Sequence, residues 1–321
     1  MKAAVHIRYG APDVIHIAEV PKPLPKEDEI LVRVHASSVN RTDCGFRDPR
    51  PWFVRFFSGL LRPKRQILGT EFSGVVESVG TNVRSFVGGE RVFGMSEKHF
   101  GTHAEYVCIP QGDMIVTMPV DLSFEDAGAI CDGYVMALSS LRAAGVKKGT
   151  EILIYGATGS IGTATVQLAR YIGAQVTAVC DGKHRGLVRS LGADDVVDAT
   201  AVDFRQMERT FDVVFDAVGK RTYRECKQLL KPQGIFASTD LGSWYHIPLY
   251  ALLTAKSAGK RVILTMPKYQ IDDFILLRHL LETGMYRPVV DRVYPIEEIV
   301  AATSYVESHQ KIGNVVITIR S

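Results

Sequence analysis

Three regularly spaced glycines, Gly156, Gly159 and Gly162, give the chain its clearest chemical signature. Glycine allows a sharp turn and leaves main-chain N–H groups open to an approaching anion. Free N–H groups at a helix start bind phosphate, and the helix dipole assists them. The Gly-x-x-Gly-x-x-Gly spacing is one residue wider at its front than the common dinucleotide fingerprint. It predicts dinucleotide contacts from Gly156, Ala157, Thr158, Gly159, Ser160, Ile161 and Gly162.

The residues on either side of this turn predict the strand and the helix that it requires. Residues 151–155 form a short apolar run that is typical of a buried parallel strand. One helical face is then formed by Ile161, Thr165, Leu168 and Ile172. Gly173 marks the end of that helix. This order favours a dinucleotide site over a glycine-rich turn without a ligand.

Strands and helices alternate through the rest of the second half. Further strands are predicted at 175–180, 195–198, 211–217, 235–239 and 261–266. Helices are predicted at 183–191 and 223–230, with a turn at 232–234. The alternation predicts an α/β fold with a doubly wound parallel sheet and a cofactor at its switch point. Val218, in the turn after the strand at 211–217, is a further predicted cofactor contact.

Residues 1 to about 120 predict mostly β structure. Strands are predicted at 2–8, 14–20 and 29–39, and many short strands between glycine turns favour a small irregular barrel. After Pro267 the sequence predicts helices at 272–283 and 296–308, with strands near Val289 and Val315.

Length and composition indicate an ordinary enzyme-like chain of two domains. It has 321 residues, 46% hydrophobic and 23% charged, and its net charge of +3 is too small to indicate nucleic-acid binding. The 5 cysteines form no Cys-x-x-Cys pair, which argues against a structural zinc lobe or a disulfide framework. No apolar run would span a membrane, and the strand-like start leaves no room for a signal peptide, so we expect a cytoplasmic protein.

Several sequence blocks resemble those of a known family. Four of them are Ser38–Asp43, Leu68–Gly80, Gly88–Gly94 and Gly101–Val107. Together with the glycine turn and the closing block Lys311–Ile317, they resemble the medium-chain dehydrogenase/reductase superfamily over nearly the whole chain. Within it, the chain is most similar to the zinc-free quinone oxidoreductase branch.

This resemblance implies a mostly-β GroES-like catalytic domain at 1–122 and 267–321 and a Rossmann cofactor domain at 123–266. It implies a reductase that transfers a hydride from NADPH to a quinone or to an activated enone or carbonyl. It also implies a homodimer, because related chains pair the edges of their cofactor sheets and 261–266 is an apolar edge strand. The rival hypothesis is a non-catalytic NADPH-binding or nucleic-acid-binding protein on the same fold.

The positions of the family's zinc ligands differ in this chain. Zinc-dependent relatives use a Cys, a His and a further Cys or Glu, but Asn40 and Thr70 fall at the first two positions. An amide and a hydroxyl are poor zinc ligands. Cys131 lies near the third position, where a small buried hydrophobic residue is the simpler interpretation. We therefore expect no metal.

Asn40 and Asp43 are the expected catalytic residues. The Asn40 amide can donate a hydrogen bond to a carbonyl or quinone oxygen, although it could instead only cap the helix predicted near Thr42. Asp43 matches an aspartate of the family pattern and could order Asn40 or a nearby arginine, or act as a cap. Glu71 is expected to be structural. No tyrosine lies between Asn40 and Thr70, so the second proton is expected from water.

The end of the strand at 175–180 bears on the choice between NADP and NAD. An acidic residue there binds the ribose hydroxyls of NAD, whereas basic residues favour the 2′-phosphate of NADP. Lys183 and Arg185 favour NADP, which we expect. Asp181 favours NAD if it faces the ribose, but it leaves both cations free if it caps the following helix. A solvated helix face is the alternative for the two basic residues.

A basic and aromatic segment at 46–65 lies between two blocks that line the active site in the family. Asp48 is its only acidic residue. Its basic residues are Arg47, Arg50, Arg55, Arg62, Lys64 and Arg65. We expect a lid in which Trp52, Phe53 and Phe56 stack on a flat substrate. The alternatives are a surface for membranes or acidic partners and a folded-down insertion with solvated arginines.

Overall fold

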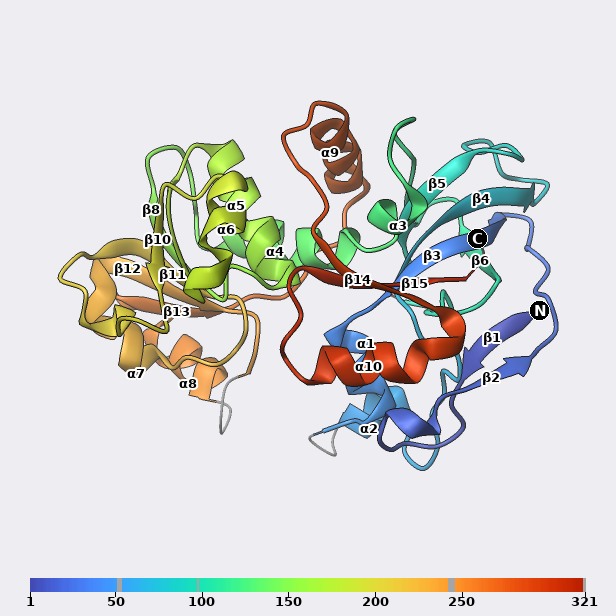
Figure 1. The fold of residues 1–321 in the computed structure, drawn as a ribbon, viewed down its shortest axis with the longest axis horizontal. Coiled ribbons are helices and arrows are strands. Elements are labelled where there is room, and N and C mark those ends of the chain that lie inside the picture. The colour runs from blue at the N-terminus through green and yellow to red at the C-terminus, as the bar shows by residue number, and fades with distance from the viewer. Residues whose placement is uncertain (51–53, 97, 242–245, 320–321) are drawn as a thin grey trace. The chain divides into compact units, whose positions relative to one another are not determined.

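The computed structural model describes the chain except residues 51–53, 97, 242–245 and 320–321. The chain forms two compact units, which are described separately (Figure 1). Unit 1 comprises Met1–Asp132 and Gln270–Ser321, and unit 2 comprises Gly133–Tyr269. The sequence placed the corresponding boundaries at 122/123 and 266/267.

Unit 1 is built on a seven-stranded, mostly antiparallel sheet in the order β14-β15-β3-β4-β5-β7, with β6 paired to β3. Its strands are β3 (Glu29–Val39), β4 (Glu71–Val79), β5 (Arg91–Met95), β6 (Tyr106–Pro110), β7 (Met114–Thr117), β14 (Val290–Pro295) and β15 (Asn314–Thr318). A separate antiparallel pair joins β1 (Lys2–Val5) to β2 (His16–Glu19). The helices are α1 (Arg41–Arg47), α2 (Arg55–Ser58), α3 (Phe124–Ala127), α9 (Ile271–Glu282) and α10 (Ile299–Glu307).

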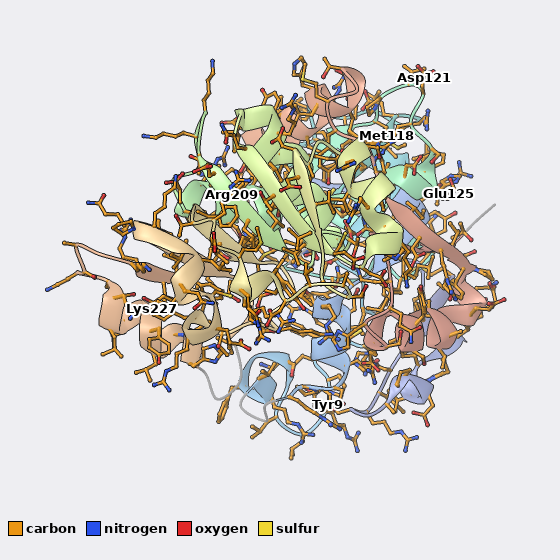
Figure 2. The ribbon with its side chains drawn as sticks, turned by 60° about the vertical axis from the view of Figure 1, so that its left-hand side comes forward. Tyr9, Met118, Asp121, Glu125, Arg209 and Lys227 are labelled. Carbon is orange, nitrogen blue, oxygen red and sulfur yellow. The ribbon has the colours of Figure 1, made fainter. Side chains whose placement is uncertain are left out.

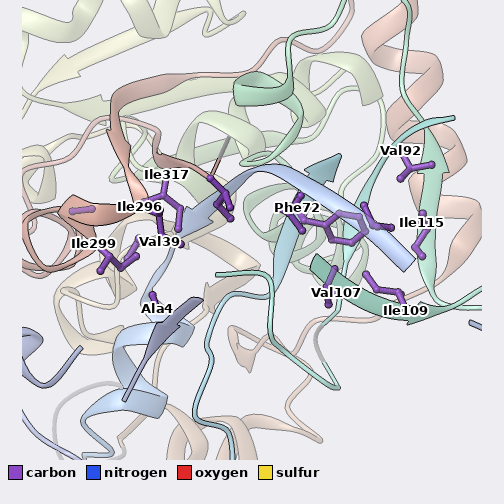
Figure 3. Packing of buried hydrophobic residues seen from close by; sticks show 14 of the residues in the cluster. Ala4, Val39, Phe72, Val92, Val107, Ile109, Ile115, Ile296, Ile299 and Ile317 are labelled. Carbon is purple, nitrogen blue, oxygen red and sulfur yellow. The ribbon is translucent and has the colours of Figure 1, made fainter. Parts of the chain in front are cut away.

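Strand β3 holds the core of unit 1 together. Its alternating apolar residues belong to one buried cluster with Phe72 of β4 and Ile317 of β15 (Figure 3). Helix α10 closes this cluster through Ile299 and Val306. The pairing of β15 with β3 brings residues 314–318 against residues 36–39. The tail therefore completes a domain begun at the other end of the chain, and the expected mostly-β architecture is confirmed.

Unit 2 contains a parallel six-stranded sheet in the order β10-β9-β8-β11-β12-β13. Its strands are β8 (Glu151–Tyr155), β9 (Gln175–Cys180), β10 (Asp195–Asp198), β11 (Phe211–Asp216), β12 (Leu230–Ser238) and β13 (Arg261–Leu264). Its helices are α4 (Cys131–Ala143, beginning in unit 1), α5 (Ser160–Ile172), α6 (Arg185–Ser190), α7 (Tyr223–Cys226) and α8 (His246–Thr254). Figure 1 shows α5 and α6 on one face of the sheet and α7 and α8 on the other. The doubly wound sheet is confirmed.

The turn predicted at 232–234 was wrong, and two helices were missed. Residues 232–234, predicted as a turn, lie inside β12, and the pairing of β11 with β12 shifts register between Phe211 and Val213 to admit them. The helices α4 and α8 were not predicted. Helix α8 is apolar through Ile247, Leu249, Leu252 and Leu253, so no polar face marks its helical period. None of the helices in the described ranges is long and apolar enough to cross a membrane.

A close approach of backbone to backbone fixes the turn between β8 and α5. Gly156 has a φ of 78°, in the left-handed region that glycine tolerates. At Gly162 an added Cβ would lie 2.1 Å from the Gly156 carbonyl oxygen and 2.8 Å from the Ala157 Cα. Both obstacles are backbone atoms, so neither can move aside easily. Gly162 thus lets the first turn of α5 lie against the end of β8.

We expect Gly162→Ala to destabilise the protein by about 1–3 kcal/mol, because the added methyl group forces the helix away from the turn. Urea denaturation of the purified variant measures this loss. Gly159→Ala is the matched control, because a Cβ there would meet no atom closer than 3.7 Å. Equal denaturation midpoints for the two variants would contradict the packing argument.

Candidate active site

The turn after β8 presents an uncapped helix start. Gly159 precedes α5 and no side chain caps it, and the first helical hydrogen bond runs from Thr163 N–H to the Gly159 carbonyl over 2.8 Å. The space beside the Gly159 Cα is open, since the nearest atom to an added Cβ is the Gly156 oxygen at 3.7 Å. Open space in front of unused N–H donors fits a phosphate group. The turn therefore has the form that a bound dinucleotide requires.

The structure brings together several of the residues predicted to contact the cofactor. A Cβ on Gly156 would lie 2.0 Å from Val218 Cγ2, so the turns after β8 and β11 touch. Thr158, Ser160 and Ile161 are partly exposed around the helix start. Ala157 differs, because its side chain is buried and its N–H donates to the Val179 carbonyl over 3.3 Å.

Asp181 and Lys183 interact with each other at the end of β9. Asp181 caps the short helix η3 (Gly182–His184) by accepting the N–H of Lys183 over 3.1 Å. Its other oxygen lies 3.0 Å from Lys183 Nζ, and these contacts hold the pKa of Asp181 below its usual value. Arg185 starts α6 just beyond. Asp181 thus serves as a cap, but Lys183 is not a free cation.

Sequence reasoning missed a cationic pocket at the carboxyl ends of β8 and β11, with a volume of about 400 Å³. It is lined by Tyr155, Gly219, Lys220, Arg221, Thr222 and His246. The Arg221 guanidinium donates to the Tyr155 hydroxyl over 2.7 Å and lies 4.4 Å above the Tyr155 ring. The backbone N–H of Arg221 donates to Asp216 over 2.6 Å. The pair Lys220-Arg221 directly after a predicted strand was the available signal.

In unit 1, Asn40 and Asp43 form a reciprocal cap at the start of α1. The Asn40 side-chain oxygen accepts the N–H of Asp43, and an Asp43 oxygen accepts the N–H of Asn40, each over 3.0 Å. The Asn40 Nδ2 donates to the Thr70 hydroxyl over 2.8 Å. An amide nitrogen carries two hydrogens, and no second acceptor for Nδ2 is found among the described residues. Asn40 therefore caps a helix and keeps one donor for a ligand.

Asp43 is a buried carboxylate that fixes three chain segments. Besides Asn40 it accepts the N–H of Gly69 over 2.8 Å, and His103 Nε2 lies 3.8 Å from it. Burial raises the pKa of Asp43, while His103 and the hydrogen bonds from Asn40 and Gly69 oppose the shift. Asp43 is 2% exposed and both of its oxygens accept backbone N–H groups, so its geometry is that of a residue that positions Asn40.

Glu71 is buried at the start of β4 and holds the first turn of α4. One carboxylate oxygen accepts the N–H groups of Cys131 and Asp132 over 2.7 and 3.0 Å, and the other accepts the Ser38 hydroxyl. Burial, aided by the charge of Asp132, raises the pKa of Glu71 to about 8. The expected structural role of Glu71 therefore takes the form of a cap for a distant helix.

Among the described residues, no three His, Cys, Asp or Glu side chains gather as metal ligands would. Cys131 is fully buried, and burial raises the pKa of its thiol well above the usual value. A neutral, buried thiol is a poor zinc ligand.

The basic and aromatic segment is tied to the rest of unit 1. Arg47 is 1% exposed, donates to the Gly10 carbonyl and pairs with Glu307, so it is not a solvated cation. Arg50 pairs with Asp48 at 3.1 Å. Phe56 is 59% exposed, whereas Trp52 and Phe53 lie outside the described residues.

Tyr9, labelled in Figure 2, joins this segment to the start of the chain. Its hydroxyl donates to the Gly59 carbonyl over 2.6 Å, and the Arg55 guanidinium lies 5.0 Å above its ring. These contacts hold two further residues of the segment, Arg55 and Gly59, against Tyr9.

Replacing Glu71 with Gln should change how stability depends on pH. A folded pKa of about 8 lies above the ordinary value of 4.5, so the native state keeps a proton that the unfolded state releases between these values. Glu71 therefore makes the wild type lose stability as pH rises through this window. Gln does not titrate, so the variant should gain up to about 1.4 kcal/mol relative to the wild type per pH unit.

Urea denaturation across this pH range measures the difference. Glu208→Gln, at an exposed glutamate, is the control for the loss of a carboxyl group elsewhere in the chain. A Glu71→Gln difference that stays constant with pH would contradict the raised pKa.

Comparison with known proteins agrees with both units. The family model of the alcohol dehydrogenase GroES-like domain matches residues 26–120, and that of zinc-binding dehydrogenase matches residues 191–317. The quinone oxidoreductase structure from Coxiella burnetii superposes with a TM-score of 0.88 at 26% identity, covering 100% of this chain and 99% of that one.

Two plant proteins align with almost the whole chain. The 2-methylene-furan-3-one reductase of Solanum lycopersicum is 29% identical over 99% of this chain and 79% of its own length. The chloroplastic NADPH-dependent alkenal/one oxidoreductase of Arabidopsis thaliana is 28% identical with the same two coverages, 99% and 79%. With the fold and the glycine turn, these matches place the chain in the medium-chain dehydrogenase/reductase superfamily, in its quinone oxidoreductase-like branch of NAD(P)H-dependent reductases.

Proposed function

We propose that this protein is an NADPH-dependent reductase that transfers a hydride, without zinc, to a quinone or to an activated enone or carbonyl. The observation that carries the proposal is the Asn40 amide, which is fixed by Asp43 and Thr70 and retains one N–H donor. It occupies a position where zinc-dependent relatives have a metal ligand. A neutral donor there can stabilise the negative charge that develops on the oxygen of an acceptor.

The chain's own residues would bind and orient the reactants. The start of α5 at Gly159 would hold the cofactor's phosphates, and Gly156 and Val218 would shape the floor beneath them. When bound, NADPH supplies the hydride, and the protein supplies placement and electrostatics. Asn40 would donate to the acceptor oxygen, while the backbone N–H of Asp43 donates to the oxygen of its side-chain amide and holds that amide in place.

The relatives support this choice of acceptor. The tomato protein's name is that of a reductase of an exocyclic enone, the Arabidopsis protein is named for alkenals and enones with NADPH, and the Coxiella protein for quinones. We propose the same acceptor class for this chain. Phe56, which is exposed on α2, is proposed as a substrate contact with Trp52 and Phe53.

Three cations of the basic segment already have partners, since Arg47 and Arg50 pair with carboxylates and Arg55 lies over the Tyr9 ring, which argues against a nucleic-acid or membrane partner. A small-molecule acceptor therefore remains the proposed partner. The cytoplasm remains the expected location.

The activity is tested by mixing purified protein and NADPH with panels of quinones and enones and following NADPH absorbance. We expect wild-type turnover without added metal and no stoichiometric zinc by elemental analysis. Gly159→Ala should abolish cofactor binding while the protein stays folded, because its Cβ fills the open space in front of the helix start. NADPH binding with no turnover of any acceptor would favour the non-catalytic alternative.

Asn40→Ser should lower kcat by about 10²–10³-fold. Serine still caps the helix, because it is as good an N-cap as asparagine, but it cannot extend an N–H to the acceptor. Steady-state kinetics and urea denaturation of the variant separate the two roles. An unchanged kcat would show that Asn40 only caps α1.

The cofactor preference depends on Lys183. A charge-assisted hydrogen bond from Lys183 to a 2′-phosphate is worth about 1.5–3 kcal/mol, so Lys183→Ala should weaken NADPH binding by about 10- to 100-fold and leave NADH unchanged. Asp181→Ser should keep or raise the NADPH preference, because Asp181 already holds the ammonium at 3.0 Å. Fluorescence titrations measure all four affinities. Tighter NADH binding in the wild type, unaffected by Lys183→Ala, would reverse the choice.

We propose a homodimer formed through the free edge of the unit 2 sheet. Strand β13 ends the sheet, and next to it Leu252, Leu253 and Met266 are 76%, 68% and 68% exposed. Sedimentation at micromolar concentration should give a dimer, and Leu252→Glu should give folded monomers. Leu24→Glu, at an 85% exposed site in unit 1, is the control and should stay dimeric. A monomeric wild type would refute this assembly.

A further inference from the structure

Strand pairing brings the chain around Lys311 toward the start of α1, although the two segments are distant in sequence. Strand β15 pairs with β3 so that Val315 lies opposite Val39. The chain that leads into β15 at Asn314 therefore passes the end of β3, where Asn40 and α1 follow. Lys311, three residues before Asn314, belongs to this approach.

Lys311 is surrounded by charged groups from several elements of unit 1. Its side chain is only partly exposed, and Nζ donates to the Gly313 carbonyl over 2.6 Å. Asp132 of α4 and Asp291 of β14 lie within electrostatic reach and favour its charged form, Glu71 of β4 does so once it has lost its own proton, and Arg41 of α1 opposes it.

Two of these acids are held in place by other groups. Glu71 accepts the N–H groups of Cys131 and Asp132, and Asp291 accepts the Tyr305 hydroxyl over 2.8 Å and the Ile312 N–H over 2.9 Å. Among the described residues, the Lys311 ammonium donates to one backbone carbonyl, which leaves two of its three hydrogens for other acceptors. A lysine has a flexible stem, so the ammonium can turn toward a ligand while its neighbours stay fixed.

We propose that Lys311 is the proton donor that completes the reduction, giving its proton to the acceptor oxygen that Asn40 also contacts. This inference rests on the proposed function. It replaces water, which the sequence favoured as the proton source because no tyrosine lies between Asn40 and Thr70.

The step balances without a further reactant. The acceptor gains two electrons and a hydrogen as hydride from NADPH, and negative charge collects on its oxygen. One N–H bond of the Lys311 ammonium then breaks and an O–H bond forms, while the electron pair stays on Nζ. The neutral amine regains a proton from water before the next cycle.

The electrostatics suit this task. Burial lowers the pKa of Lys311 to about 8, with the neighbouring acids limiting the shift. The group is therefore still charged near pH 7, and it releases its proton more readily than a solvated lysine. Because the acid form is needed, the rate should fall as pH rises through about 8.

The test compares wild type, Lys311→Met and Lys311→Arg in kcat for an enone across pH, together with the Kd for NADPH. Methionine removes the ammonium, and arginine keeps the charge but does not release a proton. We expect both variants to lose about 100-fold in kcat at pH 7, to lose the fall in rate above about pH 8, and to keep the wild-type Kd. Lys26→Met, at a lysine whose side chain is 80% exposed, is the control and should match the wild type.

Three results would overturn the proposal. These are an unchanged pH profile in Lys311→Met, full activity in Lys311→Arg, or a loss of kcat matched by an equal rise in the Kd for NADPH, which would mean that Lys311 binds the cofactor. If Lys311→Met does not fold, the arginine variant decides. If the wild type transfers hydride from NADPH to none of the quinones or enones tested, the proposed function fails, and this inference falls with it. Failure of the Lys311 proposal alone would look different, because the wild type would be active and the Lys311 variants would match it.

Discussion

The pairing of β3 with strands on both sides is the interaction on which unit 1 depends. Strand β4 brings Thr70 and Glu71 to one side of Asn40, and β15 brings the closing segment to the other. The three segments are separated by long stretches of chain, yet ladder hydrogen bonds fix them to within one register step. A slip of one residue would turn Ser38 away from Glu71 and expose the apolar face of β3. Core packing and site geometry are thus held by the same register.

Local signals explain what the sequence could predict. The strand before the glycine turn and the strand after α5 have the predicted limits, because apolar runs and glycines set their ends. Partners distant in sequence were not predictable in this way. Nothing in the residues around Arg47 indicates Glu307 as its partner, and no pattern links Tyr155 to Arg221. A buried charge is recognised only when the fold supplies its partner.

Asn40 and Asp181 each make two kinds of contact through one side chain. An amide has an acceptor end and a donor end, so Asn40 caps α1 with one and reaches Thr70 with the other. A carboxylate has two oxygens, so Asp181 caps η3 and still pairs with Lys183. In each case the sequence identified the residue, but only atomic positions could show that one side chain serves two contacts. At a crowded turn, one side chain that makes two contacts takes the place of two separate residues.

The paths of the two units along the chain imply an order of folding during synthesis. Unit 2 is one continuous stretch, Gly133–Tyr269, with parallel strands joined by local crossovers. It can acquire its structure while the ribosome is still at work. Unit 1 is interrupted, and one edge of β3 at residues 36–39 stays unpaired until residues 314–318 have been made, although β6 already pairs with residues 29–33. During that interval the end of an apolar strand is open to wrong partners. Chaperone dependence should therefore concentrate in the part of the protein that is translated first and finished last.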